Sequence, residues 1–259
     1  MPITKSDTAR QFGKQAALYA SSAGHAAGAD LSIVVQLLQA QPSWRVLDVA
    51  TGAGHTAAAV APLVSSVVAT DLTPEMVQQA AKLFATRSLS NASAEVHDVE
   101  ALNFPDASFD AVTCRIAPHH FLDIRKACSE IARVLKQGGV FVLEDNVAPS
   151  SPRFDAWVNT VERLRDPTHI RSYTVAQWRE MLATAGLRVE RVRHYRKTHD
   201  VAEWIGRSGI SEEQIACVYR AFADAAKVTR NHFRIRFDDA TGRATTFTDD
   251  KVILRARKG

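Results

Sequence analysis

A glycine-rich turn between a strand-like run and a helical segment limits this chain to few folds. The apolar run at 45–49 is followed by ATGAGH at 50–55, after which small and apolar residues continue. Small residues at 50, 52 and 54 let the backbone turn tightly and approach a ligand without interference from Cβ atoms. A strand, such a turn and a helix predict the first βα unit of a cofactor-binding α/β fold.

Short apolar runs alternate with helical periodicity through the first half of the chain. Strands are predicted at 45–49, 67–70, 94–97, 111–114 and 140–144, and helices begin near Thr73-Pro74 and at Asp123. Strands joined by crossover helices indicate a parallel sheet. The last residues, from Phe233 through the turn at 238–242 to Leu254, favour an antiparallel hairpin. We therefore predict an α/β fold with a doubly wound, mostly parallel, seven-stranded sheet, a C-terminal antiparallel hairpin and a helical lid.

The 259 residues suit one domain. Within it we expect an N-terminal helical cap (1–40), a cofactor-binding core (41–146), lid segments (147–182 and 198–231) and a hairpin that completes the sheet (232–259). Apolar residues make up 46% and charged residues 23% of the chain, as in soluble globular proteins. No run is apolar enough to predict a membrane span, and the polar start lacks the apolar core of a secretory signal, so a cytoplasmic location is expected.

Charge and cysteine usage narrow the function classes further. The net charge is +4, and the densest basic cluster is Arg188, Arg191, Arg193, Arg196 and Lys197, interrupted by Glu190. On a strand this cluster predicts a solvated face, so no nucleic-acid partner is expected. The three cysteines, Cys114, Cys128 and Cys217, are far apart and form no Cys-x-x-Cys pair, which excludes a zinc or disulfide framework by spacing.

The glycine turn by itself is consistent with two enzyme classes. Gly52 to Ala57 matches a dinucleotide fingerprint, with Asp71 seventeen residues after Gly54, so a nicotinamide-dependent oxidoreductase is one interpretation. An S-adenosylmethionine (SAM) methyltransferase is the other. Asp48 favours the second, because a carboxylate at the strand end would repel a pyrophosphate. No tyrosine has a lysine four residues later, so the Tyr-x-x-x-Lys pair of short-chain dehydrogenases is absent.

Four motifs in order resemble a known family. They are VLDVATGAGHTA, ATDLTPEMVQQA, HDVEALNFPDASFDAVTCRIAPHHF and ARVLKQGGVFVLEDN. The chain resembles the class I SAM-dependent methyltransferases, and within them the ubiquinone/menaquinone C-methyltransferase-like (methyltransferase type 11) group, over residues 8–182. One departure is Ala50, which stands where the family has its first glycine.

The resemblance implies a role for each matching residue. At the methionine end of SAM, the backbone of Ala50, Thr51, Gly52 and Gly54 would hold the ligand, supported by Asp48, and the loop from Arg115 would pass beneath it. At the adenosine end, Asp71 would accept both ribose hydroxyls and Leu72 would pack on adenine. Asp98 would accept from the adenine amino group, and Val99 would donate its N–H. Tyr19 and Phe12 would close over the cofactor.

The segment after the fourth predicted strand holds the candidate bases, His119 and His120. A histidine of near-neutral pKa can remove a proton from a hydroxyl or an activated carbon, and His120 is preferred because Phe121 indicates an inward turn. Transfer by proximity alone is the alternative. No metal is expected. Glu144-Asp145-Asn146 resembles the Asp-Asn pair of magnesium-dependent catechol O-methyltransferases, but Cys114-Arg115 replaces the further acid which those enzymes need.

The acceptor is expected under the lid. Aromatic and cationic residues there suit a quinone-like, aromatic or acyl acid acceptor, although the tryptophans serve equally well as lid core. The sequence thus predicts SAM-dependent C- or O-methylation of a small molecule by a monomer or homodimer. A nicotinamide oxidoreductase and a non-catalytic SAM-binding protein remain the alternatives.

Overall fold

The central sheet of the protein continues past its cofactor-binding half into a second helical lobe. The structure is a computed structural model that describes residues 3–21 and 28–259, with side chains for 3–17 and 28–259. Within these residues one eight-stranded sheet has the order β3-β2-β1-β4-β5-β8-β6, and β7 pairs with β8. Its strands are β1 (Arg45–Val49), β2 (Ser66–Asp71), β3 (Ala92–Val96), β4 (Phe109–Arg115), β5 (Leu135–Asn146), β6 (Leu187–Asp200), β7 (Arg236–Phe237) and β8 (Ala244–Lys258).

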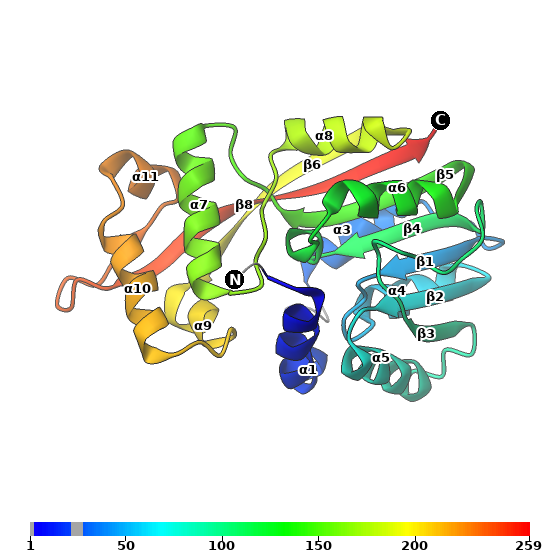
Figure 1. Ribbon diagram of the computed structural model, residues 1–259, viewed down its shortest axis with the longest axis horizontal. Coiled ribbons are helices and arrows are strands. Elements are labelled where there is room, and N and C mark those ends of the chain that lie inside the picture. The colour runs from blue at the N-terminus through cyan, green and yellow to red at the C-terminus, as the bar shows by residue number, and fades with distance from the viewer. Residues whose placement is uncertain (1–2, 22–27) are drawn as a thin grey trace.

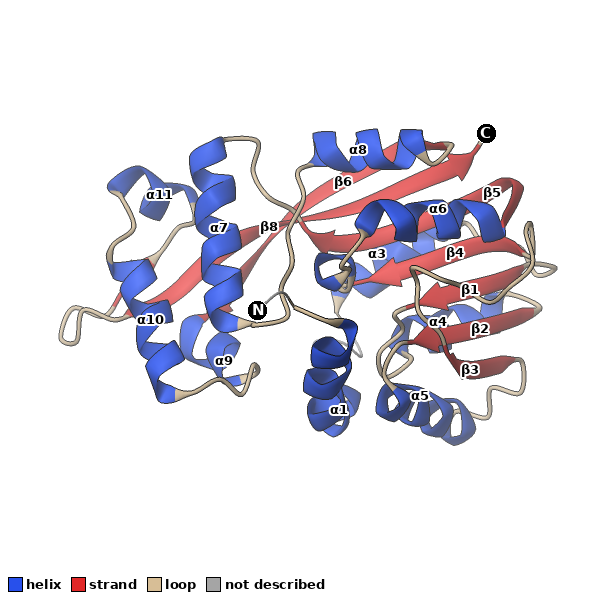
Figure 2. Ribbon diagram, in the orientation of Figure 1, coloured by secondary structure: helices blue, strands red, loops and turns tan. Residues whose placement is uncertain are grey.

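The first five strands are parallel and lie between helices, and all of them except the edge strand β3 are largely buried. α6 (Ile124–Val134) and α8 (Val175–Thr184) pack on one face around Ile131 and Trp178. α3 (Ala29–Leu38), α4 (His55–Val60) and α5 (Pro74–Thr86) pack around Val34 and Phe84 in the cluster of the other face. Figure 2 shows this layered arrangement of strands and helices. Two 3₁₀ turns, η1 (Ala61–Leu63) and η2 (Pro118–His120), lie in the connections.

Local sequence explains where these helices begin. Asp123 caps α6 by accepting a hydrogen bond of 3.0 Å from the Lys126 N–H, and apolar residues then recur on one face. Pro74 occupies the first position of α5, where its missing N–H costs nothing. Thr174 and Gln177 form a reciprocal capping box at the start of α8.

A second lobe surrounds the far halves of β6 and β8. It contains α7 (Pro152–Arg165), α9 (Val201–Gly206), α10 (Glu212–Ala223) and α11 (Lys227–His232), on the left of Figure 1. An aromatic cluster forms its core, with Trp157, Trp204, Phe222, Phe233 and Phe247 as the large members. Helix α1 (Lys5–Ser21) lies between this lobe and the carboxyl edge of the parallel strands.

The predicted fold class is confirmed, with corrections of detail. The sheet is mostly parallel and ends in antiparallel strands, but it has eight strands rather than seven because the two-residue β7 joins β8. The long partners of β8 are β5 and β6, so only a short part of the C-terminal hairpin pairs as predicted. Helix α8 falls in the predicted lid segment 147–182, yet it covers the sheet, because Trp178 and Leu182 pack into the main core.

Among the described residues, no helix combines the length and the apolar character that crossing a membrane requires.

Candidate functional site

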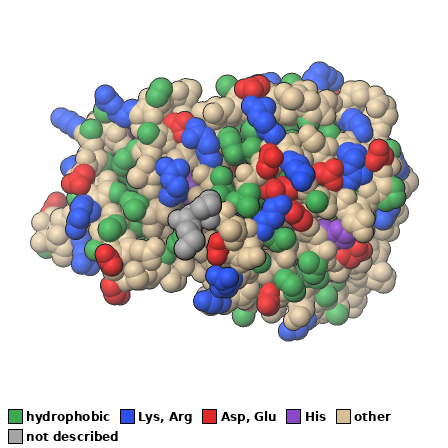
Figure 3. All heavy atoms as spheres, in the orientation of Figure 1, with side chains coloured by type: hydrophobic (Ala, Val, Ile, Leu, Met, Phe, Trp, Pro, Cys, Tyr) green, Lys and Arg blue, Asp and Glu red, His purple; other side chains and the backbone are tan. Residues whose placement is uncertain are grey.

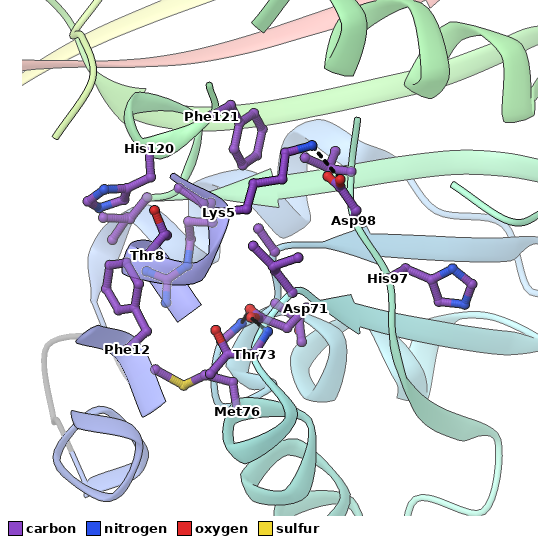
Figure 4. Close-up of a pocket in the computed structure, with 18 of the residues that line it drawn as sticks. Lys5, Thr8, Phe12, Asp71, Thr73, Met76, His97, Asp98, His120 and Phe121 are labelled. Atoms are coloured by element: carbon purple, nitrogen blue, oxygen red, sulfur yellow. Dashed lines mark hydrogen bonds and ion pairs between the residues drawn. The ribbon is translucent and has the colours of Figure 1, made fainter. Parts of the chain in front are cut away.

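A pocket opens at the carboxyl edge of the parallel strands, beneath α1. It is lined by the loops that follow β1, β2, β3 and β4, together with side chains of α1 (Figure 4). Strands of a parallel sheet all end at this edge, which is where open α/β sheets bind ligands. The predicted cofactor-binding residues in its lining are Ala50, Thr51, Gly52, Asp71, Leu72, Asp98, Val99 and Arg115.

The two glycines of the turn have different roles, one in leaving space for a ligand and one in helix packing. Gly52 has φ +55, and a Cβ built on it meets no atom within 4 Å, so its bare backbone faces open pocket space. A Cβ on Gly54 would lie 2.8 Å from the Cβ of Ala80 on α5. Gly54 is therefore required for close helix packing, and it does not line the pocket. Ala50 itself has φ +49, a conformation that favours glycine.

Asp71 lies at the end of β2 and joins the glycine turn to α5. Its Oδ2 accepts a hydrogen bond of 2.9 Å from the Gly52 N–H, and its Oδ1 accepts one of 2.9 Å from the Thr73 N–H. Each carboxylate oxygen has a second lone pair, so both can accept from a ligand as well. Burial raises the pKa of Asp71 above its usual value.

The end of the pocket beyond β3 is closed by an ion-pair cluster. Lys5, in the first turn of α1, places its Nζ 2.5 Å from Asp98 Oδ2 and 2.7 Å from Glu100 Oε2. Asp98 Oδ1 accepts a hydrogen bond of 2.9 Å from the Glu100 N–H. Figure 4 shows Lys5 reaching across the pocket to Asp98. These contacts hold α1 over the predicted adenine site.

Asp48 supports the glycine turn from below. It is 1% exposed and accepts hydrogen bonds from Thr51 Oγ1 at 2.5 Å and from Thr113 Oγ1 at 2.6 Å. Burial raises its pKa to about 6. Asp48 does not line the pocket, so its influence on a ligand passes through Thr51.

Arg115 ties three elements together at the methionine end. Its Nε donates a hydrogen bond of 3.2 Å to Thr56 Oγ1 on α4, and its Nη1 forms an ion pair with Asp30 on α3. Arg115 and Asp30 are both nearly buried. The loop after β4 is thus fixed against the turn that carries the predicted methionine contacts.

The two predicted bases have different surroundings. His120 lines the pocket beside Phe12, with ring centroids 4.8 Å apart, whereas His119 lies outside the lining and bonds Asp145 Oδ1 through Nδ1 at 2.5 Å. The Asp145 carboxylate raises the pKa of His119 despite its burial. Burial, helped by the charge of His119, lowers the pKa of His120 to about 4.

The Glu144-Asp145-Asn146 triplet at the end of β5 does not converge on a common point. Glu144 accepts a hydrogen bond of 2.5 Å from the Tyr195 hydroxyl, Asp145 bonds His119, and Asn146 accepts from Lys251. The described part of the chain contains no group of three or more His, Cys, Asp or Glu side chains that could hold a metal ion.

Comparison with known proteins identifies the family. A family model described as "Methyltransferase domain" matches residues 47–143. The chain is 34% identical to the uncharacterized methyltransferase YcgJ of Bacillus subtilis over 95% of this chain and 97% of that protein. It belongs to the class I SAM-dependent methyltransferases. The crystal structure of YcgJ superposes with a TM-score of 0.85 and covers 88% of this chain and 97% of that chain.

Two further similarities agree with this family. A putative methyltransferase from Bacillus halodurans is 35% identical, with a TM-score of 0.86 over 89% of this chain and 99% of that chain. A ubiquinone/menaquinone biosynthesis C-methyltransferase from Geobacter sp. is 39% identical over 42% of this chain and 48% of that protein. The cofactor of this methyltransferase is SAM, and the open cradle at Gly52 beside the Asp71 carboxylate suits it.

The structure adds residues that sequence patterns missed. Lys5, Asp30 and Thr56 reach the site from α1, α3 and α4. Asp30 had one local signal, since an acid in the first turn of a helix is favoured there. The side chain of Tyr19, a predicted cofactor contact, lies outside the described residues.

Proposed function

We propose that this methyltransferase transfers the methyl group of SAM to carbon or oxygen of a small-molecule acceptor. The observation that carries the proposal is the continuity of one pocket under α1, from Asp98 and Asp71 past the glycine turn to Phe12, His120 and Phe121. The adenosine would bind at the first two carboxylates, and the methionine at the backbone of residues 50–52. The acceptor would then meet aromatic rings and an imidazole at the far end.

The hydrogen bonds of His120 define which nitrogen can act as a base. Nδ1 lies 3.1 Å from the Thr168 carbonyl oxygen, which can only accept, and 3.2 Å from Thr168 Oγ1, which donates its hydrogen to Asp166 Oδ1 at 2.7 Å. Nδ1 therefore carries the hydrogen. Nε2 therefore has the lone pair when the ring is neutral. It lies 3.9 Å from Asp166 Oδ2, beyond hydrogen-bond distance. A neutral ring with a free Nε2 lone pair can take a proton from the acceptor.

SAM supplies an electrophilic methyl group when bound. The protein would align the acceptor with that group, exclude water by the closure of α1, and accept the acceptor's proton at His120 Nε2. A hydroxyl acceptor would lose its proton as the O–CH₃ bond forms, and a phenol-like carbon acceptor would lose one after the C–CH₃ bond forms. The aromatic lining favours quinone-like or aromatic acceptors, with acyl acids as the further class. The name of the Geobacter relative, a ubiquinone/menaquinone biosynthesis C-methyltransferase, agrees with a quinone-like acceptor.

The experiment is an acceptor screen with labelled SAM, followed by kinetics of His120→Ala. We expect methyl transfer to a phenol, quinol or acyl acid, and a decrease in kcat of about 10²-fold or more in the variant. Affinity for SAM should be unchanged, and His194→Gln, which alters an exposed histidine, serves as the control. Normal turnover by His120→Ala would leave proximity as the mechanism, and failure of every acceptor class would contradict the proposed function.

The pH dependence provides a separate check on the base. His120 is active when neutral, so kcat/KM should stay level from pH 8 to about 5 and fall only toward its low pKa of about 4. The ring of His119 lies 4.2 Å from that of His120. In His119→Gln the nearby positive charge is lost, which raises the pKa of His120 and moves the acid limb to higher pH. If the acid limb of the kcat/KM profile does not move in His119→Gln, the charge of His119 does not influence the pKa of His120.

A further inference from the structure

One face of the sheet has a group of arginines that the methyl-transfer site does not use. Helix α3 packs on β5 and β8, and β6 is the outermost strand. Directly paired residues point to the same face. Ile253 of β8 and Tyr195 of β6 pack in the cluster that contains α3, so they mark this face.

Register places five arginines on that face, beyond α3. Arg255 pairs with Arg191, Arg257 pairs with Arg188, and Arg193 pairs with Ile253. We call Arg188, Arg191, Arg193, Arg255 and Arg257 the arginine face. The sequence predicted a solvated strand surface from the basic cluster of this strand alone. Arg255 and Arg257 follow some sixty residues later, and only the pairing of β8 with β6 brings them to the same face.

The arginine face contains one acid. Glu190 lies at the bulge of β6, where it pairs with Arg188 at 3.2 Å, with Arg257 at 2.9 Å, and with Arg255. Five arginines and one glutamate carry +4, which equals the net charge of the whole chain. On the opposite face, in view in Figure 3, basic and acidic side chains are interspersed. The excess positive charge of the molecule is thus concentrated on this part of the sheet.

The arginine face also has unused donors. Arg191 and Arg193 are exposed, and within the described residues neither has an ion pair or side-chain hydrogen bond. Arg255 is 6% exposed, and its Nε has no hydrogen-bond partner. Burial and the neighbouring charge of Arg257 lower the pKa of Arg255. An anion at this face would weaken that repulsion and accept hydrogen bonds from the exposed guanidinium groups of Arg191 and Arg193, whereas the Nε of Arg255 is buried.

We propose that the arginine face binds the phosphate backbone of a nucleic acid. Guanidinium groups match phosphate oxygens in pairs, and all five cations here are arginines rather than lysines. The five arginines occupy three successive rows of paired residues on β6 and β8, and with about 7 Å between rows they span about 14 Å along the strands. At a rise of about 3.4 Å per nucleotide, that length matches about four phosphates of one strand.

The site is separate from the cofactor pocket. The arrowheads of β1, β4 and β5 point toward α1 and the pocket, whereas the end of β8 that carries Arg255 and Arg257 lies at the other edge of the sheet (Figure 1). A membrane surface fits less well. The exposed large apolar residues of the described chain, Leu63, Val96 and Val228, lie on η1, β3 and α11, away from the arginine face.

The test compares two double variants that lose the same charge. Arg191→Gln/Arg193→Gln removes the two unpaired arginines of the face, and Arg87→Gln/Arg153→Gln removes two exposed arginines, one directly after α5 and one in α7. Binding of a labelled DNA duplex is measured by anisotropy between about 50 and 200 mM salt. For about four phosphate contacts, log Kobs against log salt should have a slope of about −3.6 in the parent and the control. The slope should weaken to about −1.8 in the first variant.

Each other outcome overturns the proposal. Equal slopes for the two double variants would mean that the face makes no phosphate contacts. The same conclusion would follow if the duplex did not bind at about 50 mM salt. Binding of anionic phosphatidylglycerol vesicles without binding of the duplex would assign the face to a membrane. Affinity for S-adenosylhomocysteine, measured in parallel, verifies that each variant is folded.

Discussion

At the scale of single residues, the buried acid Glu144 should make stability depend on pH. It is 1% exposed, only one of its oxygens has a partner, and burial raises its pKa to about 7. A folded-state pKa above the unfolded value favours folding at low pH, and this contribution is lost as pH rises through about 7. Glu144→Gln keeps an acceptor for Tyr195 and removes the ionisation. We expect the variant to gain about 2 kcal/mol relative to the parent between pH 5.5 and 8.5.

Urea unfolding at the two pH values measures this difference. Other titrating groups are common to both proteins and cancel in the comparison. If the stability difference between parent and variant is the same at both pH values, Glu144 is not the titrating group.

Residues at strand ends were predictable, and their partners were not. Asp71 and Asp98 directly follow predicted strands, and parallel strands deliver such carboxylates to one edge. Lys5, Asp30 and Asp166 reach the pocket region through contacts far apart in the sequence, which no local pattern encodes. Both histidines were predicted as candidate bases, but the burial that lowers the pKa of His120 and the Asp145 carboxylate that raises the pKa of His119 become visible only in the packed molecule.

At the scale of elements, helix α1 is the part that covers the pocket. A Cβ on Gly13 would lie 3.1 Å from Glu75 Oε2 of α5, so the absent side chain lets α1 approach α5 closely. Gln11 donates a hydrogen bond of 2.8 Å to Asp166, and Gln15 donates one of 3.1 Å to the Ser208 carbonyl. The helix is therefore attached both to the cofactor-binding core and to residues next to the second lobe.

Lys5→Ala should loosen this cover. It removes the ion pairs to Asp98 and Glu100, which are partly exposed and therefore contribute about 1 kcal/mol. We expect SAM to dissociate about fivefold faster, as measured by stopped-flow displacement. Lys14→Ala changes an exposed lysine of the same helix and should leave the rate unaltered. Equal rates in the two variants would show that Lys5 does not hold α1 closed.

Elements with strong local signals were predicted well. Helix α6 has a capping residue and apolar residues on the one face that packs on the sheet. Strand β1 is a short, mostly apolar run, as a buried parallel strand requires. The hairpin was predicted only in part, because the long register of β8 with β5 and β6 depends on residues 46 or more positions away. Helix α8 was assigned to the lid because its apolar face does not reveal which core it joins.

At the scale of the whole molecule, β6 and β8 connect two aromatic and aliphatic cores. The first half of β6 and the last half of the antiparallel β8 lie in the main sheet, and their other halves lie in the second lobe, so the lobes share continuous strands. Phe247 of β8 is 1% exposed and contacts Trp204 and Phe222 in the second lobe. Shared strands predict that the two lobes unfold together.

Phe247→Ala should therefore destabilise the entire chain. Loss of this buried ring costs about 3–5 kcal/mol, and Phe247→Leu should restore most of it. Far-ultraviolet circular dichroism and tryptophan fluorescence should report one coincident transition, shifted to lower urea. Two separate transitions would show that the lobes unfold independently.

The most direct test of the account is calorimetric titration of the ligand-stripped protein with S-adenosylhomocysteine and with NADH. We predict micromolar binding of S-adenosylhomocysteine and none of NADH. Asp71→Ala should weaken the binding by about 1.5–3 kcal/mol, because the variant would lack the charged acceptor predicted for the ribose hydroxyls, while the exposed Asp239→Ala should bind normally. Binding of NADH alone, or undiminished affinity in Asp71→Ala, would contradict the assignment of the pocket beneath α1 as the SAM site.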